Sequence, residues 1–328
     1  HSETWVLDLA SGRRERLSLP GEDISQVGPV WMPDGRRLLL GRLLSGNVGS
    51  TWIVAVDGSS SEEILIRVTR EGFSSTFGPS PDGRKILYPK AVQGVQQVFL
   101  YDVSSRQSVQ LTDSPGSKFD MIWSPDGRFL AYSSDRAGSE DLYLRDTRTG
   151  STRRLTAAPG AEAAGSWSRD GARIAYQDNV GTTFVVEVAT GAVGELIPAA
   201  WEPGTPTWGP DGATVAIAAL KPYSLRFREG ISQILTVDTA TGEQRWVDPI
   251  PFASLSNRVN SGPVWSPDGR EMAFVIASRL WVMSVDANGE PTGPPRRLTD
   301  EVAESPSWGN GSREILYQSN GRLRIVSA

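Results

Sequence analysis

Four charged residues are the first candidates for chemistry in this sequence, because each stands shortly before one of its repeated tryptophans. They are Lys118, Asp120, Glu162 and Glu304. Three carboxylates brought together could hold a hard cation, since such ions take oxygen ligands. Carboxylates can also act as general acid and base, although no closely paired acids mark such a site here. Solvated side chains that hold no ligand are the simpler alternative.

A second group of candidates lies in two long connections, KPYSLRFREG at residues 221–230 and DPIPFASLSNRVN at residues 248–260. Long loops on rigid scaffolds are where binding concentrates, and arginine and aromatic side chains anchor interfaces. The candidates for binding an anionic ligand or a protein partner are Lys221, Tyr223, Arg226, Phe227, Arg228 and Arg258. The alternative is an ordinary loop whose aromatic rings fold back onto the scaffold.

Composition limits the remaining chemistry. The chain has no cysteine, and its one histidine is His1, which removes disulfides, thiolate chemistry and the histidine-based triads. The formal charge of −5 and the pI near 5.2 argue against a nucleic-acid partner. No apolar run approaches the ~20 residues that span a bilayer, and no signal peptide is visible. We therefore expect no catalytic residue, no required cofactor and no membrane span, with a divalent cation as a candidate ligand.

A repeated tryptophan-x-proline-aspartate-glycine motif organises the chain. Aligned on the aspartate, the units fall at Asp34, Asp82, Asp126, Asp170, Asp211 and Asp268, with a degenerate seventh at Gly311. Their spacing runs from 41 to 57 residues, which is typical of propeller blades when the content is strand-like. The tryptophans recur with the same period as the units, so we interpret them as packing between blades and not as a ligand-stacking array.

Each unit predicts four short strands. In the third, MIW, FLAYSS, DLYLRD and TRRLT are separated by Pro125-Asp126-Gly127 and by a second turn, TRTG. Proline presets φ, aspartate can accept hydrogen bonds from the following backbone, and glycine accepts a positive φ. The second strand alternates apolar and polar residues, as a half-buried strand does. The fourth strand is the most polar, which suits an exposed outer edge.

We predict an all-β, seven-bladed β-propeller of four-stranded antiparallel blades, formed as a single domain over residues 1–328. Seven hairpins set this number, and six or eight blades are the alternatives. Residues 3–20 would contribute to the closing blade, because they supply strands that the last unit lacks. One strand is left over, because residues 5–9 and 323–327 compete for one place. The repeats fall at about 21–72, 73–116, 117–160, 161–200, 201–256, 257–300 and 301–328.

The openings WSPDGRFLAYSS and WSPDGREMAF, followed by LYL or LWV and then RRLT, resemble TolB-type, WD40-like propeller repeats. The resemblance covers essentially the whole chain and is specific for the fold, which does not imply a function. The second half, including AALKPYSLRFREGISQILTVDTATGE, is similar to the propeller that precedes a metal-dependent amidohydrolase domain in large bacterial proteins. The metal ligands of that family lie in the downstream domain, so the resemblance transfers no catalytic residue.

These resemblances imply two classes of function. The chain is either a non-catalytic binding or scaffold module, serving as the substrate-gating or interaction domain of an amidohydrolase-type hydrolase, or a free-standing TolB-like interaction protein of the bacterial envelope. The partner is then another protein or a fused or associated hydrolase domain, and the location is extracytoplasmic, periplasmic or secreted. A propeller enzyme that uses carboxylates such as Asp120 and Glu162 is a third class.

Overall fold

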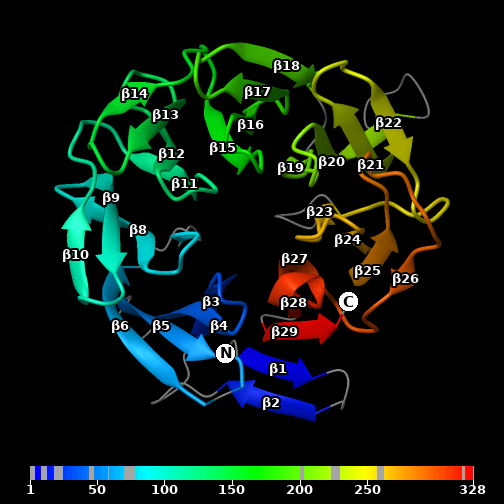
Figure 1. Cartoon of the computed structure of the whole chain (residues 1–328), viewed down its shortest axis with the longest axis horizontal. Coiled ribbons are helices and arrows are strands. Elements are labelled where there is room, and N and C mark those ends of the chain that lie inside the picture. Colours follow the sequence, from blue (N-terminus) through cyan, green and yellow to red (C-terminus); the bar gives the residue numbers. More distant parts are fainter. Residues whose placement is uncertain are drawn as a thin grey trace. The chain divides into compact units, whose positions relative to one another are not determined.

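The computed structural model describes ten stretches of the chain, residues 4–8, 13–17, 25–43, 48–57, 59–69, 78–199, 203–222, 230–256, 262–319 and 322–327. Within them the chain forms β-strands and one 3-10 helix, η2 (Asn310–Ser312). It divides into two compact units, residues 1–163 with 321–325 and residues 164–320 with 326–328. Figure 1 labels the strands.

The first compact unit contains three four-stranded antiparallel blades. The β3–β6 blade consists of β3 (Ser25–Trp31), β4 (Arg37–Leu43), β5 (Val48–Ala55) and β6 (Ser61–Thr69). The β7–β10 blade consists of β7 (Gly78–Pro79), β8 (Lys85–Val92), β9 (Val95–Asp102) and β10 (Gln107–Gln110). The β11–β14 blade consists of β11 (Lys118–Trp123), β12 (Phe129–Ser134), β13 (Asp141–Asp146) and β14 (Thr152–Arg154). In each, strands adjacent in the sequence are hydrogen-bonded neighbours.

Three more blades of the same order follow along the chain. The β15–β18 blade consists of β15 (Glu162–Trp167), β16 (Arg173–Asp178), β17 (Thr183–Glu187) and β18 (Val193–Ile197). The β19–β22 blade consists of β19 (Thr207–Trp208), β20 (Thr214–Pro222), β21 (Gly230–Asp238) and β22 (Gln244–Val247). The β23–β26 blade consists of β23 (Val264–Trp265), β24 (Glu271–Ile276), β25 (Arg279–Ser284) and β26 (Arg296–Arg297).

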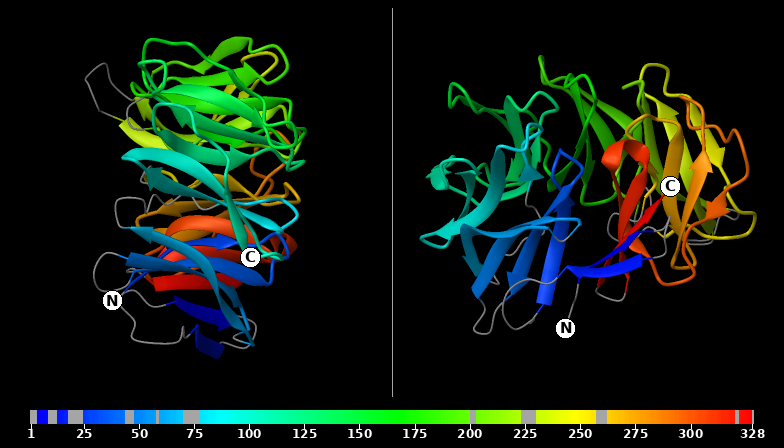
Figure 2. Two further views of the ribbon diagram at one scale, coloured as in Figure 1. Left: turned by 90° about the vertical axis from the view of Figure 1, so that its left-hand side faces the viewer. Right: turned by 60° about the horizontal axis from the view of Figure 1, so that its bottom comes forward.

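The remaining strands come from both ends of the chain and form a five-stranded sheet. Its order is β2-β1-β29-β28-β27, with β1 (Thr4–Asp8), β2 (Arg13–Leu17), β27 (Glu304–Gly309), β28 (Glu314–Ser319) and β29 (Arg322–Ser327). Strand β1 pairs parallel to β29 at Thr4 and Leu323, and Figure 2 shows the two strands from further sides. The prediction that both ends share one sheet is confirmed.

The blade number is corrected: the described strands form six four-stranded antiparallel blades in an all-β propeller, not the predicted seven. The two segments expected to compete for one place are both present, as β1 and β29. A strand edge carries free N–H and C=O groups, so β1 adds to the edge of β29 and does not replace it. The resulting sheet has a fifth strand and one parallel pair. The prediction of a single domain over residues 1–328 stays a prediction.

Strand β12 shows how tightly a blade is packed. Its residues from Leu130 to Ser134 are all buried, including both serines. The predicted alternation of a half-buried strand is therefore wrong here, because other strands and side chains cover both of its faces. On one face, Leu130 and Tyr132 pack with Leu87 and Val98 of the β7–β10 blade in one apolar cluster. Burial of aliphatic and aromatic side chains of this kind contributes roughly 1.5–3 kcal/mol each.

The repeated tryptophans connect neighbouring blades. The indole N–H of Trp123 donates to the carbonyl oxygen of Gly78 at 3.0 Å. Trp208 donates in the same way to Ser166, and Trp308 to Val264, each at 3.0 Å. These three indoles bond to the backbone of the first strand of the preceding blade, which supports the interpretation of the tryptophans as packing between blades.

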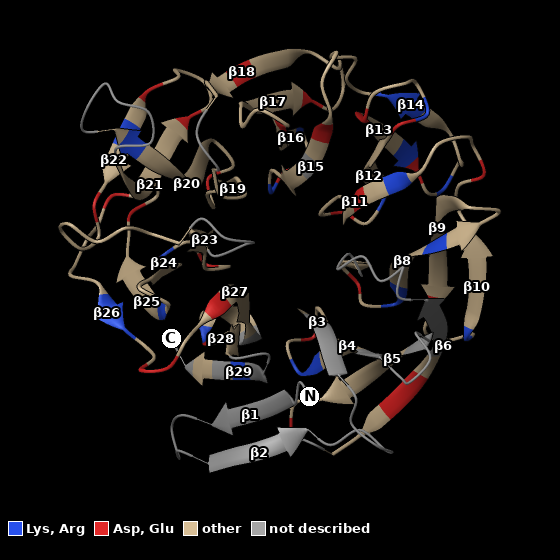
Figure 3. Ribbon diagram, turned by 180° about the vertical axis from the view of Figure 1, so that it is seen from behind, with Lys and Arg blue, Asp and Glu red and all other residues tan. Residues whose placement is uncertain are grey.

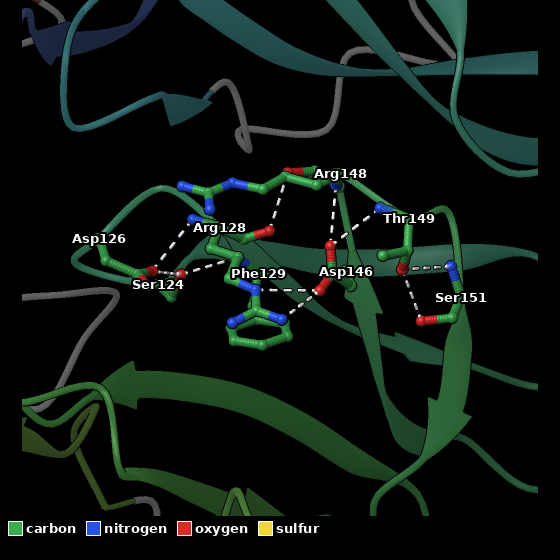
Figure 4. Close-up of polar contacts among 9 residues, drawn as sticks. Ser124, Asp126, Arg128, Phe129, Asp146, Arg148, Thr149 and Ser151 are labelled. Atoms are coloured by element: carbon green, nitrogen blue, oxygen red, sulfur yellow. Dashed lines mark hydrogen bonds and ion pairs between the residues drawn. The ribbon is translucent and has the colours of Figure 1, made fainter.

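In the turns after Trp123, Trp167 and Trp265 a serine donates to the aspartate of the same turn, as Figure 4 shows for the β11–β14 blade. Ser124 Oγ donates to Asp126 Oδ1 at 2.5 Å and accepts from the Phe129 N–H at 2.8 Å. Gly127 has a φ of 68°, the left-handed region that glycine adopts without strain. Arg128 also reaches Asp146 Oδ2 of the next turn, with Nη2 at 2.8 Å. The motif therefore builds one end of each blade from local contacts.

Candidate functional site

The predicted charged residues Lys118, Asp120 and Glu162 lie at the opposite end of the β11–β14 blade, which we call the loop end. It consists of residues 113–120, 133–141 and 156–162. These are the connection that enters the blade, the connection between β12 and β13, and the connection that leaves the blade, each with the adjoining strand ends. The other end, residues 123–129 and 146–152, is the turn end (Figure 4). The loop end lies in the first compact unit.

Lys118 is fully buried although it carries a charged group. Its Nζ donates to the carbonyl oxygen of Gly116 at 2.6 Å, and also to those of Ser114 and Pro115. Three carbonyl oxygens therefore take the place of water around the ammonium group. Burial lowers the pKa of Lys118, and the positive charge of Arg136 lowers it further. The ammonium group holds the loop from Ser114 to Gly116 closed.

The loop around Lys118 depends on a glycine. Gly116 has a φ of 76°, and a Cβ built on it would lie 2.5 Å from the backbone nitrogen of Arg136. Only glycine allows this approach, because it has no side chain. The Ser117 N–H then donates to Asp135 Oδ1 at 2.7 Å. These contacts join the connection before β11 to the connection between β12 and β13.

Asp120 occupies an irregular position inside β11. Its φ is 48°, and the pairing of β11 with β12 shifts register between Phe119 and Ile122. Oδ2 accepts a hydrogen bond from Ser133 Oγ at 3.2 Å. Burial raises the pKa of Asp120, and the Ser133 hydroxyl opposes this rise. The pKa of Glu140 is raised as well, first by its own burial and then by the negative charge of Asp120.

Glu162 is buried and belongs to the frame of the blade. Its carboxylate accepts a hydrogen bond from the hydroxyl of Thr156, which itself accepts from the Leu142 N–H at 2.9 Å. The same hydrogen bond from a backbone N–H to a threonine hydroxyl recurs in other blades, where Thr112 accepts from Val98 at 2.9 Å and Thr299 from Leu280 at 3.0 Å. The threonine of the RRLT motif therefore continues the sheet with its side chain.

Glu304 lies in the second compact unit, exposed at the start of β27. The pairing of β27 with β28 shifts register directly after it, between Glu304 and Ser307, and Ser305 has a φ of 51°. Asp120 and Ser305 each stand three residues before a repeated tryptophan. The other repeats carry glycine, alanine or threonine at this place, so no shared residue type in the sequence indicates the irregular backbone.

Lys221 is exposed at the end of β20, with Nζ 5.7 Å from the centre of the Trp246 ring. A cation over an aromatic face is attracted to its negative quadrupole. The other predicted binding residues of the long connections lie outside the described residues; they are Tyr223, Arg226, Phe227, Arg228 and Arg258. Their binding role stays a prediction.

The structure brings two of the predicted carboxylates, Asp120 and Glu162, into one loop end, together with Lys118. Glu304 belongs to the other unit. In the part of the chain that the structure describes, no group of three or more histidine, aspartate or glutamate side chains is placed to hold a metal ion. The predicted divalent cation stays a prediction. What the loop end offers chemically is negative charge held in place by hydrogen bonds.

Two features of the loop end were not predicted. Asp141 is fully buried and pairs with Arg154 at 2.7 Å, which fastens β13 to β14. The guanidinium carbon of Arg136 lies 3.6 Å from the centre of the Tyr143 ring. Arg136 and Asp141 both belong to the SDRAGSED segment of the third repeat, where a run of charged residues is typical of a solvated loop. Their partners are distant in the sequence, so no spacing rule reveals them.

Part of the repeat region matches a known protein family. Residues 68–221 match the family described as the TolB beta propeller domain. TolB from Acinetobacter baumannii is 24% identical with a TM-score of 0.52, and the match covers 71% of this chain and 56% of that one. This chain thus spans little more than half of that protein. No curated protein sequence matches the chain.

Two enzymes share the fold over nearly the full chain. An oligogalacturonate lyase in complex with manganese is 15% identical, with a TM-score of 0.73, and the match covers 99% of this chain and 96% of that chain. An oligogalacturonate lyase from Vibrio parahaemolyticus is 14% identical, with a TM-score of 0.69 and coverage of 99% and 95%. These likenesses establish the fold alone. Among the described residues, no helix has the length and apolar composition that a membrane crossing requires.

Proposed function

We propose that this chain, which carries TolB-type β-propeller repeats, is a non-catalytic binding module whose partner is another protein. The supporting observation is that charged side chains at the loop end of the β11–β14 blade form hydrogen bonds within the blade and its connections. The ammonium group of Lys118 closes a loop, and Glu162 accepts from Thr156. Side chains engaged in this way build a rigid scaffold that presents its connections.

The long connections are the proposed binding surface. The first leaves β20 at Pro222, which pairs with Gly230, and the second follows β22 and is held at Leu255 by a bridge to Ile276 of β24. Lys221 at the base of the first connection is exposed, and the residues that follow it combine arginine with aromatic side chains. Arginine and aromatic residues dominate the binding energy of many protein interfaces. A partner surface with acidic residues around an apolar pocket fits this composition.

Affinity capture from an envelope extract tests the proposal. The native chain is compared with a variant carrying Lys221→Ala, Arg226→Ala and Arg228→Ala, and with a matched control carrying Arg148→Ala and Arg169→Ala, two exposed arginines on other blades. We expect one protein to be retained by the native chain and the control and lost by the loop variant. Equal capture by all three forms would contradict the proposed surface.

A separate assay tests the non-catalytic part of the proposal. The purified chain is incubated with oligogalacturonate and Mn²⁺, and formation of the unsaturated product is followed by its absorbance. We expect no turnover. Turnover that disappears in Asp120→Asn would replace the binding module with an enzyme that uses the loop-end carboxylates.

A second candidate is the interaction or substrate-gating domain of an amidohydrolase-type, metal-dependent hydrolase. The similarity of residues 218–243 to the propellers of such proteins supports it. An extracytoplasmic location, periplasmic or secreted, is proposed for both candidates. Sequencing the parent gene on both sides of residues 1–328 tests it. A downstream domain with the histidine ligands of that family would support this candidate, and a reading frame without one would contradict it. Cell fractionation of the source organism tests the location.

A further inference from the structure

The fourth strand of each blade ends its sheet, and one of these six edge strands differs from the other five. Strands β6, β14, β18, β22 and β26 each carry arginine or glutamate, whereas β10 reads Gln-Ser-Val-Gln. Figure 3 shows β10 in the colour of uncharged residues, beside red on β6 and blue on β14. Charges on an edge strand keep other strands from pairing with it. Strand β10 lacks this protection.

All four residues of β10 are exposed, and Val109 has 54% of its surface in solvent. The strand is well ordered against β9, with Val109 opposite Leu100 and Gln110 opposite Phe99. An exposed β-branched residue in an uncharged edge favours addition of a further strand.

The hydrogen-bond pattern of β10 defines which backbone groups are free. The Leu111 N–H donates to the Val98 carbonyl at 2.8 Å, and antiparallel pairs alternate between bonded and non-bonded positions. Gln107, Val109 and Leu111 therefore direct their backbone groups to β9. Ser108 and Gln110 direct theirs away from the sheet, where they offer two donors and two acceptors to another strand.

We propose that β10 pairs antiparallel with β10 of a second copy of this chain, with Val109 facing Val109 across a two-fold axis. In this register Ser108 of each copy lies opposite Gln110 of the other, so the outward groups of both residues form four backbone hydrogen bonds. Val109 takes the central, non-bonded position, where facing side chains are closest. Two four-stranded blades become one continuous sheet.

The charges that flank β10 select this arrangement. Arg106, which also pairs with Glu62 of β6, precedes the strand, and Asp113 follows it; both are exposed. Antiparallel pairing with Val109 at the axis places Arg106 opposite Thr112 of the second copy, beside its Asp113. Opposite charges then lie together at both ends of the paired strands. A parallel arrangement would bring like charges together, and the charged edges of the other five blades would repel a second copy of themselves.

The proposed dimer is weak and closed. A pairing of about four residues per copy buries far less than the ~1,000 Å² of a stable interface, so association depends on protein concentration. The interface is the same on both copies, and β10 is the only uncharged edge among the six, so association stops at two. This inference is independent of the binding function proposed above.

Sedimentation equilibrium of the full chain over a range of concentrations tests the pairing. We expect the native chain to dimerise reversibly. Val109→Lys and Val109→Glu should each weaken dimerisation about fivefold or more, because like charges then face each other across the axis. An equimolar mixture of the two variants should regain association, since lysine then faces glutamate. Folding defects cannot produce this reciprocal recovery.

Two controls make the result specific. Val193→Lys places the same change on the exposed edge of β18, where Val193 has 47% of its surface in solvent, and should leave dimerisation unchanged. Amide hydrogen exchange of Ser108 and Gln110 should slow as the concentration rises, while that of Val109 is slow throughout. A native chain that stays monomeric at all concentrations, equal weakening by Val193→Lys, or a mixture without recovery would each overturn the proposal.

Discussion

The turn end and the loop end of the β11–β14 blade use charge in opposite ways. At the turn end, Asp126 is exposed, and its partner Ser124 lies two residues away. At the loop end, Asp120 accepts from Ser133, thirteen residues away, and Lys118 is fully buried. The pKa of Asp126 is lowered by the Ser124 hydroxyl, whereas burial raises that of Asp120. Similar residues thus acquire different roles from their surroundings.

The difference has an energetic meaning. A hydrogen bond at an exposed turn competes with water, so its net contribution is small. A buried ammonium group or carboxylate that loses its partner has no water to replace it, so the loss is large. We therefore expect substitutions that leave a buried group at the loop end without its hydrogen-bond partner to cost more stability than the loss of a partner at the exposed turn end.

The largest effect is expected for Lys118→Met. The substitution keeps the length of the side chain but leaves the carbonyl groups of Ser114 and Gly116 without their donor in a buried site. We expect a loss of about 3 kcal/mol in the free energy of unfolding, measured with denaturant. The matched control is Lys85→Met, an exposed lysine on β8, with an expected change within about 0.5 kcal/mol. Equal losses would contradict the role given to Lys118.

Thr156→Val should have the next largest effect. It removes the hydroxyl that accepts from the Leu142 N–H and donates to Glu162. The expected loss in unfolding free energy is about 2 kcal/mol, because two buried groups lose a partner. Thr190→Val, in an exposed turn of the next blade, is the control and should be nearly neutral. A large loss in the control would show that threonine packing, not the hydrogen bonds, sets the effect.

A comparison of two tryptophan substitutions distinguishes the contribution of an indole hydrogen bond from that of ring packing. Trp208 and Trp265 are both buried, and the indole of Trp208 bonds to Ser166, while the Trp265 N–H has no hydrogen-bond partner. Both Trp208→Phe and Trp265→Phe lose ring area, but only the first also loses a hydrogen bond. We expect Trp208→Phe to be the more destabilising of the two by about 1 kcal/mol in thermal or denaturant unfolding. The reverse order would refute the assigned indole bond.

The smallest effects, under about 1 kcal/mol, are expected for Asp126→Asn and Asp120→Asn. At neutral pH the two substitutions should change the free energy of unfolding in opposite directions. The folded-state pKa of Asp126 is depressed, so its stabilisation is present above the ordinary value of 3.8 and is lost as pH falls. The folded-state pKa of Asp120 is raised, so its ionised form destabilises the fold above that pKa.

Unfolding measured at pH values from neutral to about 3 separates the two residues. Asp126→Asn should lower stability at neutral pH, and Asp120→Asn should raise it, since asparagine keeps the shape and tolerates the positive φ. Both differences should shrink on acidification, because the aspartates of the native chain then become protonated. A pH-independent effect of either substitution would exclude titration as its cause.

The turn end was predictable from the sequence because its contacts are local. Pro125, Asp126 and Gly127 each have a conformational preference that the turn uses, and the tryptophan before them repeats with the blades. The exposed fourth strands followed from their polar residues. At the loop end, Lys118, Asp120 and Glu162 were named as candidates together with Glu304, which belongs to the other unit, and the burial of Lys118 and Glu162 was not predicted. Charged residues are usually exposed, so composition alone points the wrong way.

The class of fold, the blade repeats and the positions of the turns could be predicted from the sequence, because hydrophobic alternation and turn chemistry act over a few residues. The number of four-stranded blades, the presence of both β1 and β29 in one five-stranded sheet, the enclosure of Lys118 by carbonyl groups and the place of β10 at a sheet edge became known only from the tertiary structure. These features depend on contacts between distant segments, and a strand or a charge has no fixed partner until the blades pack.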